Sequence, residues 1–122
     1  MARTQIPVQT IAGNGGSDVD VAFTAGDDAN EMYFLNTGRE LLLIRTGTGA
    51  VGITTIDSVE DENGRTGDKA ITVAASKIAA AGPFPPKLFN QRASADFGRV
   101  FVDIDDDTDL EYAVVSFTPG DR

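Results

Sequence analysis

The chain contains no cysteine and no histidine. Without cysteine it can form neither a disulfide nor a thiolate metal site, and it has no thiol nucleophile. The lack of histidine removes the commonest general base and the commonest transition-metal ligand, so no Ser-His or Cys-His catalytic arrangement can be built. We therefore expect a protein that is not an enzyme, with no catalytic residues and no cofactor.

Positive charge and long hydrophobic runs are also scarce. The 122 residues carry 10 Lys and Arg against 19 Asp and Glu, for a formal net charge of -9. Nucleic acids and anionic membranes both attract clustered Lys and Arg, so neither is an expected partner. The first residues lack the apolar run of a secretory signal, and no segment approaches the length of a membrane span. We expect a soluble protein that is made in a cytoplasm.

The sequence does contain short apolar or alternating runs separated by Gly, Asn and Asp, which is the pattern of strands and turns. Residues 74–81 are expected to be strand or irregular, because Gly82 and Pro83 end the segment before a helix can form. The expected strands are residues 5–11, 19–23, 32–35, 40–46, 51–56, 70–74, 99–104 and 110–117. This spacing predicts an all-β fold: a single domain over residues 1–122, built as a β-sandwich or barrel (jelly-roll-like) of about eight short antiparallel strands.

Three turns are expected between these strands. Residues 36–38 are Asn-Thr-Gly, a tight turn, because Asn and Gly tolerate positive φ. Residues 47–52 match the dinucleotide-binding pattern G-x-G-x-x-G, but the residues that follow are β-branched and alternating instead of helical. We therefore predict a glycine-rich hairpin turn there. Residues 99–104 and 110–117 are predicted to form a second β-hairpin.

The acidic residues are concentrated in two places. Residues 57–69 are the most loop-like part of the chain and predict an exposed excursion. Between Asp103 and Asp109 the alternating aspartates could supply the oxygen ligands that Ca²⁺ prefers. An EF-hand loop is excluded, because Thr108 and Val114 stand where Gly and Glu are required. A solvated hairpin loop is the favoured interpretation, with a Ca²⁺ site as the alternative.

Paired carboxylates could perform acid and base chemistry in a cleft beside sugar-stacking aromatics. The chain has no Trp and only two Tyr. Asp20, Glu40 and Glu111 occupy strand positions that are expected to face outward. We therefore expect no catalysis from these carboxylates.

The most unusual segment is Gly-Pro-Phe-Pro-Pro at residues 82–86. Its three prolines fix φ and remove backbone donors, which predicts a stiff extended connector. This connector either crosses from one sheet to the other with Phe84 and Phe89 in the core, or serves as a preorganised docking loop for a partner protein. We also expect a short N-terminal arm, residues 1–8, that is loose when free and ordered by a partner. The predicted partner-binding residues are Ile6, Pro7, Val8, Pro83, Phe84, Pro85, Pro86, Leu88 and Phe89.

Three stretches of the chain resemble a family of small proteins that are encoded beside the major capsid protein in tailed-phage genomes. They are ARTQIPV at residues 2–8, NTGRELL at residues 36–42 and GPFPPKLFNQ at residues 82–91. The resemblance implies a head decoration or cement-like protein with a compact β fold, which sits on the outer capsid surface and reinforces it. The implied partner is the major capsid protein, the implied location is the virion, and a homotrimer or another homo-oligomer on the capsid is an expectation. The family has no catalytic residues to transfer.

Two other functions remain open from the sequence. The first is another virion part of the same small β design, such as a head-tail joining or tail structural protein. The second is a carbohydrate-binding β-sandwich that attaches particles or cells to glycans. The lack of Trp and the scarcity of Tyr count against the second.

Overall fold

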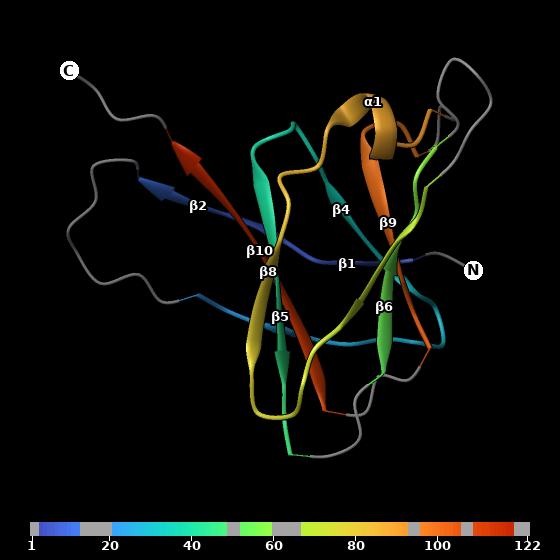
Figure 1. Ribbon diagram of the computed structural model, residues 1–122. Coiled ribbons are helices and arrows are strands. Elements are labelled where there is room, and N and C mark those ends of the chain that lie inside the picture. The colour runs from blue at the N-terminus through green and yellow to red at the C-terminus, as the bar shows by residue number, and fades with distance from the viewer. Residues whose placement is uncertain are drawn as a thin grey trace.

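The computed structural model describes residues 3–12, 21–48, 52–59, 67–92, 96–105 and 109–118. Two mixed sheets of short strands form a β-sandwich, and one helical turn lies at one end of it (Figure 1). The all-β sandwich expected from the sequence is confirmed. Within the described ranges, no helix is long and apolar enough to cross a membrane.

Each sheet contains five strands. The order in the first sheet is β1 (Thr4–Gln5), β4 (Met32–Leu35), β9 (Arg99–Ile104), β6 (Ile53–Ile56) and β7 (Lys69–Thr72). The order in the second sheet is β2 (Val8–Ala12), β10 (Leu110–Thr118), β5 (Glu40–Thr46) and β8 (Ile78–Ala81), and β3 (Thr24–Ala25) pairs with β10. β7 and β8 therefore stand at the edges of their two sheets.

The sheets are not purely antiparallel, which corrects the sequence-based expectation. β1 pairs parallel to β4, and β2 pairs parallel to β10. All the other strand pairs are antiparallel. The described part of the chain also contains ten strands instead of about eight, because the N-terminal segment divides into β1 and β2 and because β8 forms within residues 74–81, while β3 stands in place of the strand expected at 19–23.

Consecutive strands mostly lie in different sheets. β9 belongs to the first sheet and β10 to the second, so the hairpin predicted from residues 99–104 and 110–117 is wrong. The hairpin predicted at residues 47–52 is wrong for the same reason, since β5 and β6 also lie in different sheets. Among the described strands, only β6 and β7 are both consecutive and paired. The turns are therefore mainly arches between two layers.

The strand positions agree better with the sequence than their pairing does. β4, β5 and β9 have the predicted bounds, and β8 lies within the segment predicted as strand or irregular. The strand predicted at 19–23 is wrong over residues 21–23, which belong to no strand; β3 starts at Thr24, and residues 19 and 20 lie outside the described ranges. The turn at residues 36–38 has a positive φ of 96° at Gly38, as predicted for glycine, but not at Asn36, and it joins strands of different sheets.

The core lies between the sheets, and strand alternation supplies it. In β9, Val100, Val102 and Ile104 are buried, while the residues between them are partly exposed. β5 in the second sheet alternates in the same way, and its side chains Leu42 and Ile44 enter the core from that side. Burying such side chains contributes about 1.5–3 kcal/mol each. One buried polar pair spans the layers, because the hydroxyls of Thr54 and Tyr112 are 2.7 Å apart.

Candidate functional site

The N-terminal residues are tied into the fold, which corrects the prediction of a loose arm. Thr4–Gln5 pair with β4, and Val8–Ala12 pair with β10. Between these strands the chain passes from one sheet to the other, where the Ile6 N–H donates to the Tyr33 carbonyl at 2.8 Å. The Ile6 side chain is 0% exposed and belongs to the core. Of the three residues predicted to bind a partner here, only Pro7 is exposed.

The proline-rich connector joins β8 of the second sheet to β9 of the first, so the predicted crossing between sheets is confirmed. It is not extended throughout. The Gly82–Pro83 peptide bond is cis, and Pro86–Phe89 form the helical turn α1. Pro86 opens the turn because its missing N–H is one that a helix leaves unsatisfied at its start. The connector therefore bends back onto the sandwich end.

Phe84 anchors this connector in the core, as the crossing interpretation predicted. Its side chain is 1% exposed. The Phe84 ring lies 5.8 Å from the Phe34 ring and 5.4 Å from the Phe89 ring, in tilted and edge-on arrangements that aromatic pairs favour. Phe89 is only partly buried and packs against the core from outside. The aromatic contacts fix the backbone on both sides of Pro85 and Pro86.

A pair of asparagines joins this connector to the turn after β4. The Asn36 Nδ2 donates to the Phe84 carbonyl at 2.9 Å and to the Asn90 Oδ1 at 2.6 Å. The Asn90 Nδ2 donates back to the Asn36 carbonyl at 3.0 Å, and the Asn36 Oδ1 accepts from the Gly38 N–H at 3.1 Å. Asn36 is 5% exposed, so these bonds satisfy a buried amide. We call Asn36 and Asn90 the asparagine clasp.

Glu40 completes the turn beneath the clasp. It was expected to face outward, but it is only 3% exposed. Its carboxylate accepts from the Thr37 N–H at 2.7 Å, the Thr37 hydroxyl at 2.9 Å and the Arg39 N–H at 3.2 Å. A buried charge requires such partners, since burial without them is costly. Glu40 therefore has a structural role that its sequence position alone did not indicate.

The clasp connects two stretches of the chain that are distant in the sequence. Asn36 belongs to the stretch 36–42, and Asn90 belongs to the stretch 82–91. The two stretches also meet at Gly82, where an added Cβ would lie 2.9 Å from the Glu40 carbonyl oxygen, and at Gly38, where an added Cβ would lie 3.3 Å from Pro86. Segments that are far apart in sequence thus form one compact corner of the fold.

Several apolar side chains near the clasp are exposed to solvent. Pro83, Pro85 and Pro86 are exposed, and the Leu88 side chain is 43% exposed. Two more exposed hydrophobic residues belong to the same end of the sandwich: Leu35 ends β4, and Phe97 precedes β9. We call this surface the clasp end; it consists of Leu35, Pro83, Pro85, Pro86, Leu88 and Phe97.

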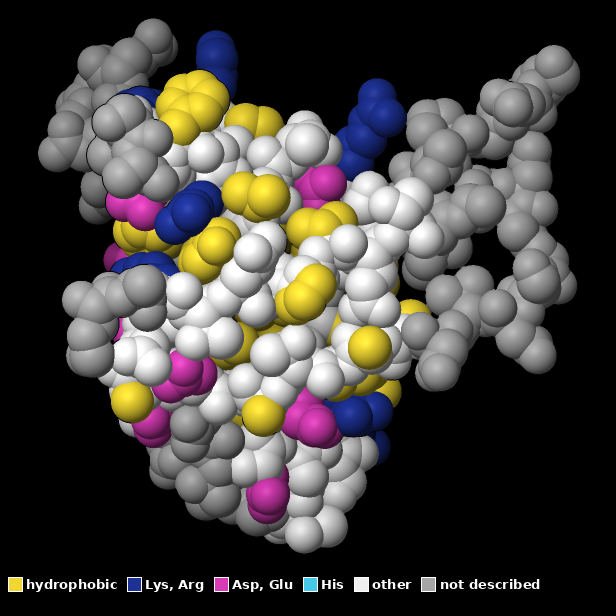
Figure 2. Space-filling view, turned by 180° about the vertical axis from the view of Figure 1, so that it is seen from behind, with side chains coloured by type: hydrophobic (Ala, Val, Ile, Leu, Met, Phe, Trp, Pro, Cys, Tyr) yellow, Lys and Arg dark blue, Asp and Glu magenta, His cyan; other side chains and the backbone are white. Residues whose placement is uncertain are grey.

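Among the described residues, five large hydrophobic side chains are exposed, and three of them, Leu35, Leu88 and Phe97, belong to the clasp end. Figure 2 shows the molecule from behind with this end still at the top, and hydrophobic side chains lie between polar and charged atoms there, many of them in the upper half. Scattered hydrophobic residues are normal for a protein surface, whereas a group at one place indicates an interaction site. The clasp end is therefore the candidate functional site, and it retains the predicted residues Pro83, Pro85, Pro86 and Leu88.

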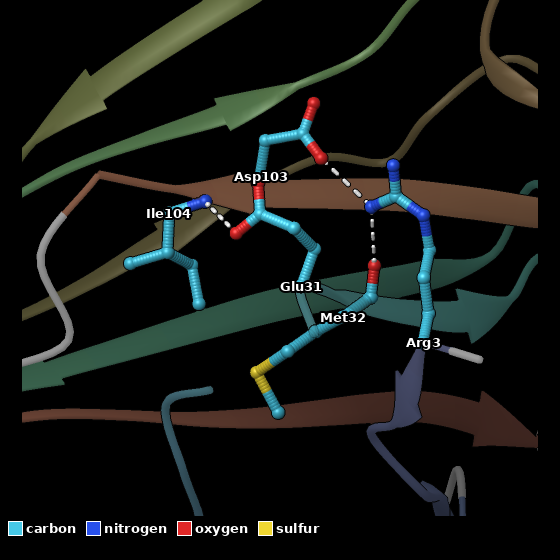
Figure 3. Close-up of polar contacts among 5 residues, drawn as sticks. All are labelled: Arg3, Glu31, Met32, Asp103 and Ile104. Atoms are coloured by element: carbon cyan, nitrogen blue, oxygen red, sulfur yellow. Dashed lines mark hydrogen bonds and ion pairs between the residues drawn. The ribbon is translucent and has the colours of Figure 1, made fainter. Parts of the chain in front are cut away.

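A polar cluster lies on the outer side of the first sheet (Figure 3). The Arg3 guanidinium donates to the Asp103 carboxylate at 2.7 Å and to the Met32 carbonyl at 3.2 Å. The Glu31 carboxylate accepts from the Ile104 N–H at 3.1 Å. These contacts join the N-terminal segment, β4 and β9. These hydrogen bonds therefore stabilise the packing of the three segments.

The carboxylates in this cluster influence one another. Burial and a hydrogen bond with Asp103 raise the pKa of Asp57 to about 7. Burial would also raise the pKa of Asp103, but hydrogen bonds with Asp57 and Arg3 lower it below its usual value. Burial raises the pKa of Glu31. Two carboxylates that share one proton titrate as a pair.

Two arginines cover aromatic rings on the same outer face. The Arg3 guanidinium carbon lies 3.9 Å from the Phe101 ring centroid, and that of Arg99 lies 4.1 Å from the Tyr33 ring centroid. Such cation–π contacts shield the rings from water while keeping the charge solvated. The rings of Phe101 and Tyr33 are therefore covered by the protein's own side chains.

The acidic stretch at residues 103–109 falls only partly within the described ranges. Asp103 is paired with Arg3, and the Asp105 carboxylate accepts from the Ile53 N–H at 2.6 Å. Residues 106–108 lie outside the described ranges, as do residues 60–66 of the predicted acidic excursion. Among the residues that are described, no group of three or more acidic side chains could hold a metal ion. The Ca²⁺ alternative stays a prediction.

The chain was compared with protein-family models, with curated proteins and with solved structures, and none of them matches.

Proposed function

We propose that the chain is a structural virion protein that binds the outer surface of a tailed-phage capsid and stabilises it through contacts with the major capsid protein. The observation that supports this most is the asparagine clasp. It joins the stretches 36–42 and 82–91, which carry the family resemblance. Its hydrogen bonds also fix the backbone of the proline-rich connector, which carries exposed apolar side chains. A rigid apolar surface loses little entropy when a partner covers it.

A repetitive particle suits a small binding surface. One contact is repeated at every symmetry-related position, so many weak contacts together reinforce the shell. The net charge of -9 keeps free copies from associating nonspecifically before they bind. The proposed role is therefore binding and reinforcement, not catalysis.

Capsids that lack the protein provide the direct test. We expect the purified protein to co-sediment with such capsids, to saturate at hundreds of copies per head and to raise the temperature at which the heads release DNA. If no binding occurs at saturating concentration, the proposal is wrong. Saturation at about six or twelve copies would instead indicate a ring-shaped head-tail or tail part.

A pair of matched variants tests the clasp end. Leu88 and Ile53 are exposed to nearly the same extent, 43% and 44%, but Ile53 stands at the opposite end of the first sheet. Leu88→Glu places a charge in the proposed interface and should weaken capsid binding about tenfold or more, equivalent to about 1.4 kcal/mol. Ile53→Glu should leave binding unchanged. Equal effects of the two substitutions would exclude the clasp end as the contact surface.

A further inference from the structure

Charge is unevenly distributed along the chain. Residues 69–92 contain four of the ten Lys and Arg and none of the 19 Asp and Glu, so this stretch is +4 in a chain of net charge -9. It comprises β7, β8, the proline-rich connector and α1. β7 and β8 are edge strands of their sheets, and neither strand carries a carboxylate, although Asp68 immediately precedes β7. We call residues 69–92 the basic flank.

β8 presents an open backbone edge on this flank. Among the described strands it pairs with β5 alone. The Thr46 N–H donates to the Lys77 carbonyl, and hydrogen-bonded and non-bonded residue pairs alternate along an antiparallel ladder. Continuing this alternation through the β5–β8 register places Ile78 and Ala80 in non-bonded pairs. Their N–H and C=O groups therefore point away from β5, toward the open side.

This edge has little of the protection that natural edge strands carry. Such strands are usually kept from pairing by charged residues, by proline or by extreme shortness. β1 and β3 have two residues each, and β7 carries Lys69. β8 consists of Ile-Ala-Ala-Ala, whose small side chains leave the backbone accessible, and Ile78 is 60% exposed. β8 is thus an edge that is suited to accept another strand.

Both ends of β8 are held in place. At its start, the Thr46 hydroxyl donates to the Ala74 carbonyl at 2.6 Å and accepts from the Lys77 N–H at 3.0 Å. At its other end, Gly82 packs closely against the Glu40 backbone below the asparagine clasp. An edge that is already ordered loses little entropy when it binds.

A shallow cleft of about 420 Å³ runs beside β8, lined by residues of β7 and of β8, including Lys69, Ile71 and Ala80. Figure 1 shows the two strands side by side on the near side of the sandwich. The cleft offers room for alternate side chains of an added strand. Lys69 lies at its rim, and Lys77 lies at the start of β8.

We propose that β8 is a docking edge that accepts one extended, acidic segment of a partner protein as an added strand of the second sheet. The outward N–H and C=O groups of Ile78 and Ala80 supply main-chain hydrogen bonds, and the cleft receives alternate side chains. The basic flank selects acidic segments by charge complementarity. Nucleic acids and lipids could use the lysines, but they cannot use the backbone edge. This inference does not rest on the proposed capsid function.

The test uses a fluorescein-labelled peptide of about eight residues that alternates Val and Glu, with fluorescence anisotropy as the readout. A peptide with Gln in place of Glu should bind about fivefold more weakly or worse, and the difference should shrink at high salt. Ala80→Pro removes one outward N–H without removing a β5–β8 hydrogen bond, and it should weaken binding about tenfold or more. Ala80→Ser keeps the N–H and should bind like the parent protein.

Amide hydrogen exchange on the parent protein provides a measurement that does not depend on how a variant folds. Peptide addition should slow the exchange of the Ile78 and Ala80 amides more than that of other exposed amides. The proposal is overturned if these amides are unaffected, if Ala80→Pro binds as tightly as Ala80→Ser, or if the Gln peptide binds equally well. Tighter binding to a short DNA duplex or to phosphatidylserine vesicles would equally overturn it.

Discussion

Individual buried polar residues decide how the clasp end is held. Asn36 makes hydrogen bonds to Phe84, Asn90 and Gly38 through one side-chain amide. Asparagine is suited to this position because its amide is both donor and acceptor in a fixed plane. A hydrophobic side chain of similar size would leave the Phe84 carbonyl without this partner.

Asn36→Ala should therefore destabilise the protein by about 1–3 kcal/mol, because it leaves buried polar groups unsatisfied and opens a small cavity. The change is measured as the free energy of unfolding in urea. Thr72→Ala, on the exposed edge strand β7, is the control and should change stability by less than about 0.5 kcal/mol. If Asn36→Ala is as stable as this control, the clasp contributes nothing to folding.

Asp57 makes stability depend on pH. Its pKa is raised to about 7, whereas an unfolded Asp titrates near 4. Between these values the folded state keeps a proton that the unfolded chain has lost, so stability falls as the pH rises from about 4 to 7. The lowered pKa of Asp103 acts in the opposite sense, and its contribution is lost only at more acidic pH.

Asp57→Asn should flatten this dependence and should be more stable than the parent protein above about pH 7. The gain should be about 1 kcal/mol or less, because the half-buried carboxyl is screened by solvent. Urea unfolding at a series of pH values between 5 and 8 measures the slope, and carboxyl NMR reports the titration of Asp57 directly. Parallel slopes for the two proteins would contradict this assignment.

At the scale of elements, the connection from β8 to α1 is set by Gly82. Its φ is 116°, and a Cβ would lie 2.9 Å from the Glu40 carbonyl oxygen and 3.1 Å from the Phe84 ring. Only glycine combines this backbone conformation with such close approach. The direction of the proline-rich connector, and with it the position of Leu88, depends on this one residue.

Gly82→Ala should cost about 2 kcal/mol or more in unfolding free energy, because both the backbone and the Cβ are strained. Gly67→Ala is a matched control, since nothing lies within 4 Å of its added Cβ. It should change stability by about 0.5 kcal/mol or less. The thermal unfolding temperatures of the two variants are compared. A larger loss of stability in Gly82→Ala than in Gly67→Ala is caused by the local geometry at residue 82, and not by the general effect of replacing a glycine.

At the scale of the whole molecule, the repeated crossing between sheets makes the two layers interdependent. β5, β8 and β10 are each joined in sequence to strands of the first sheet. Neither sheet can be completed from one continuous piece of chain, so the sandwich should unfold as a unit. Nonlocal pairing of this kind is also expected to slow folding to milliseconds or longer.

Urea unfolding followed by far-UV circular dichroism and by tyrosine fluorescence should therefore give one coincident transition. The chain lacks Trp, and its two tyrosines, Tyr33 in the first sheet and Tyr112 in the second, report the packing of both layers. Circular dichroism reports the strands themselves. Two separated midpoints would show that the layers unfold independently.

Local features of the fold can be predicted from the sequence alone. Short apolar or alternating runs between turn residues predicted the bounds of β4, β5 and β9, and the lack of His and Cys removed whole classes of chemistry. The turn at residues 36–38 followed from the conformational freedom of Gly38, whereas Asn36 does not adopt positive φ and contributes hydrogen bonds instead. The crossing of the connector through Phe84 also followed from its composition.

The tertiary structure alone decided which strands pair. Alternation indicates which side chains face a core, but it does not distinguish a hairpin from an arch, and so β9 and β10 were wrongly paired. The burial of Ile6 and Glu40, and the hydrogen bond between Asn36 and Asn90, depend on segments that meet only after both layers have packed. The physical reason is that strand patterns are set within a few residues, whereas sheet membership is set by packing between residues that are distant in the sequence.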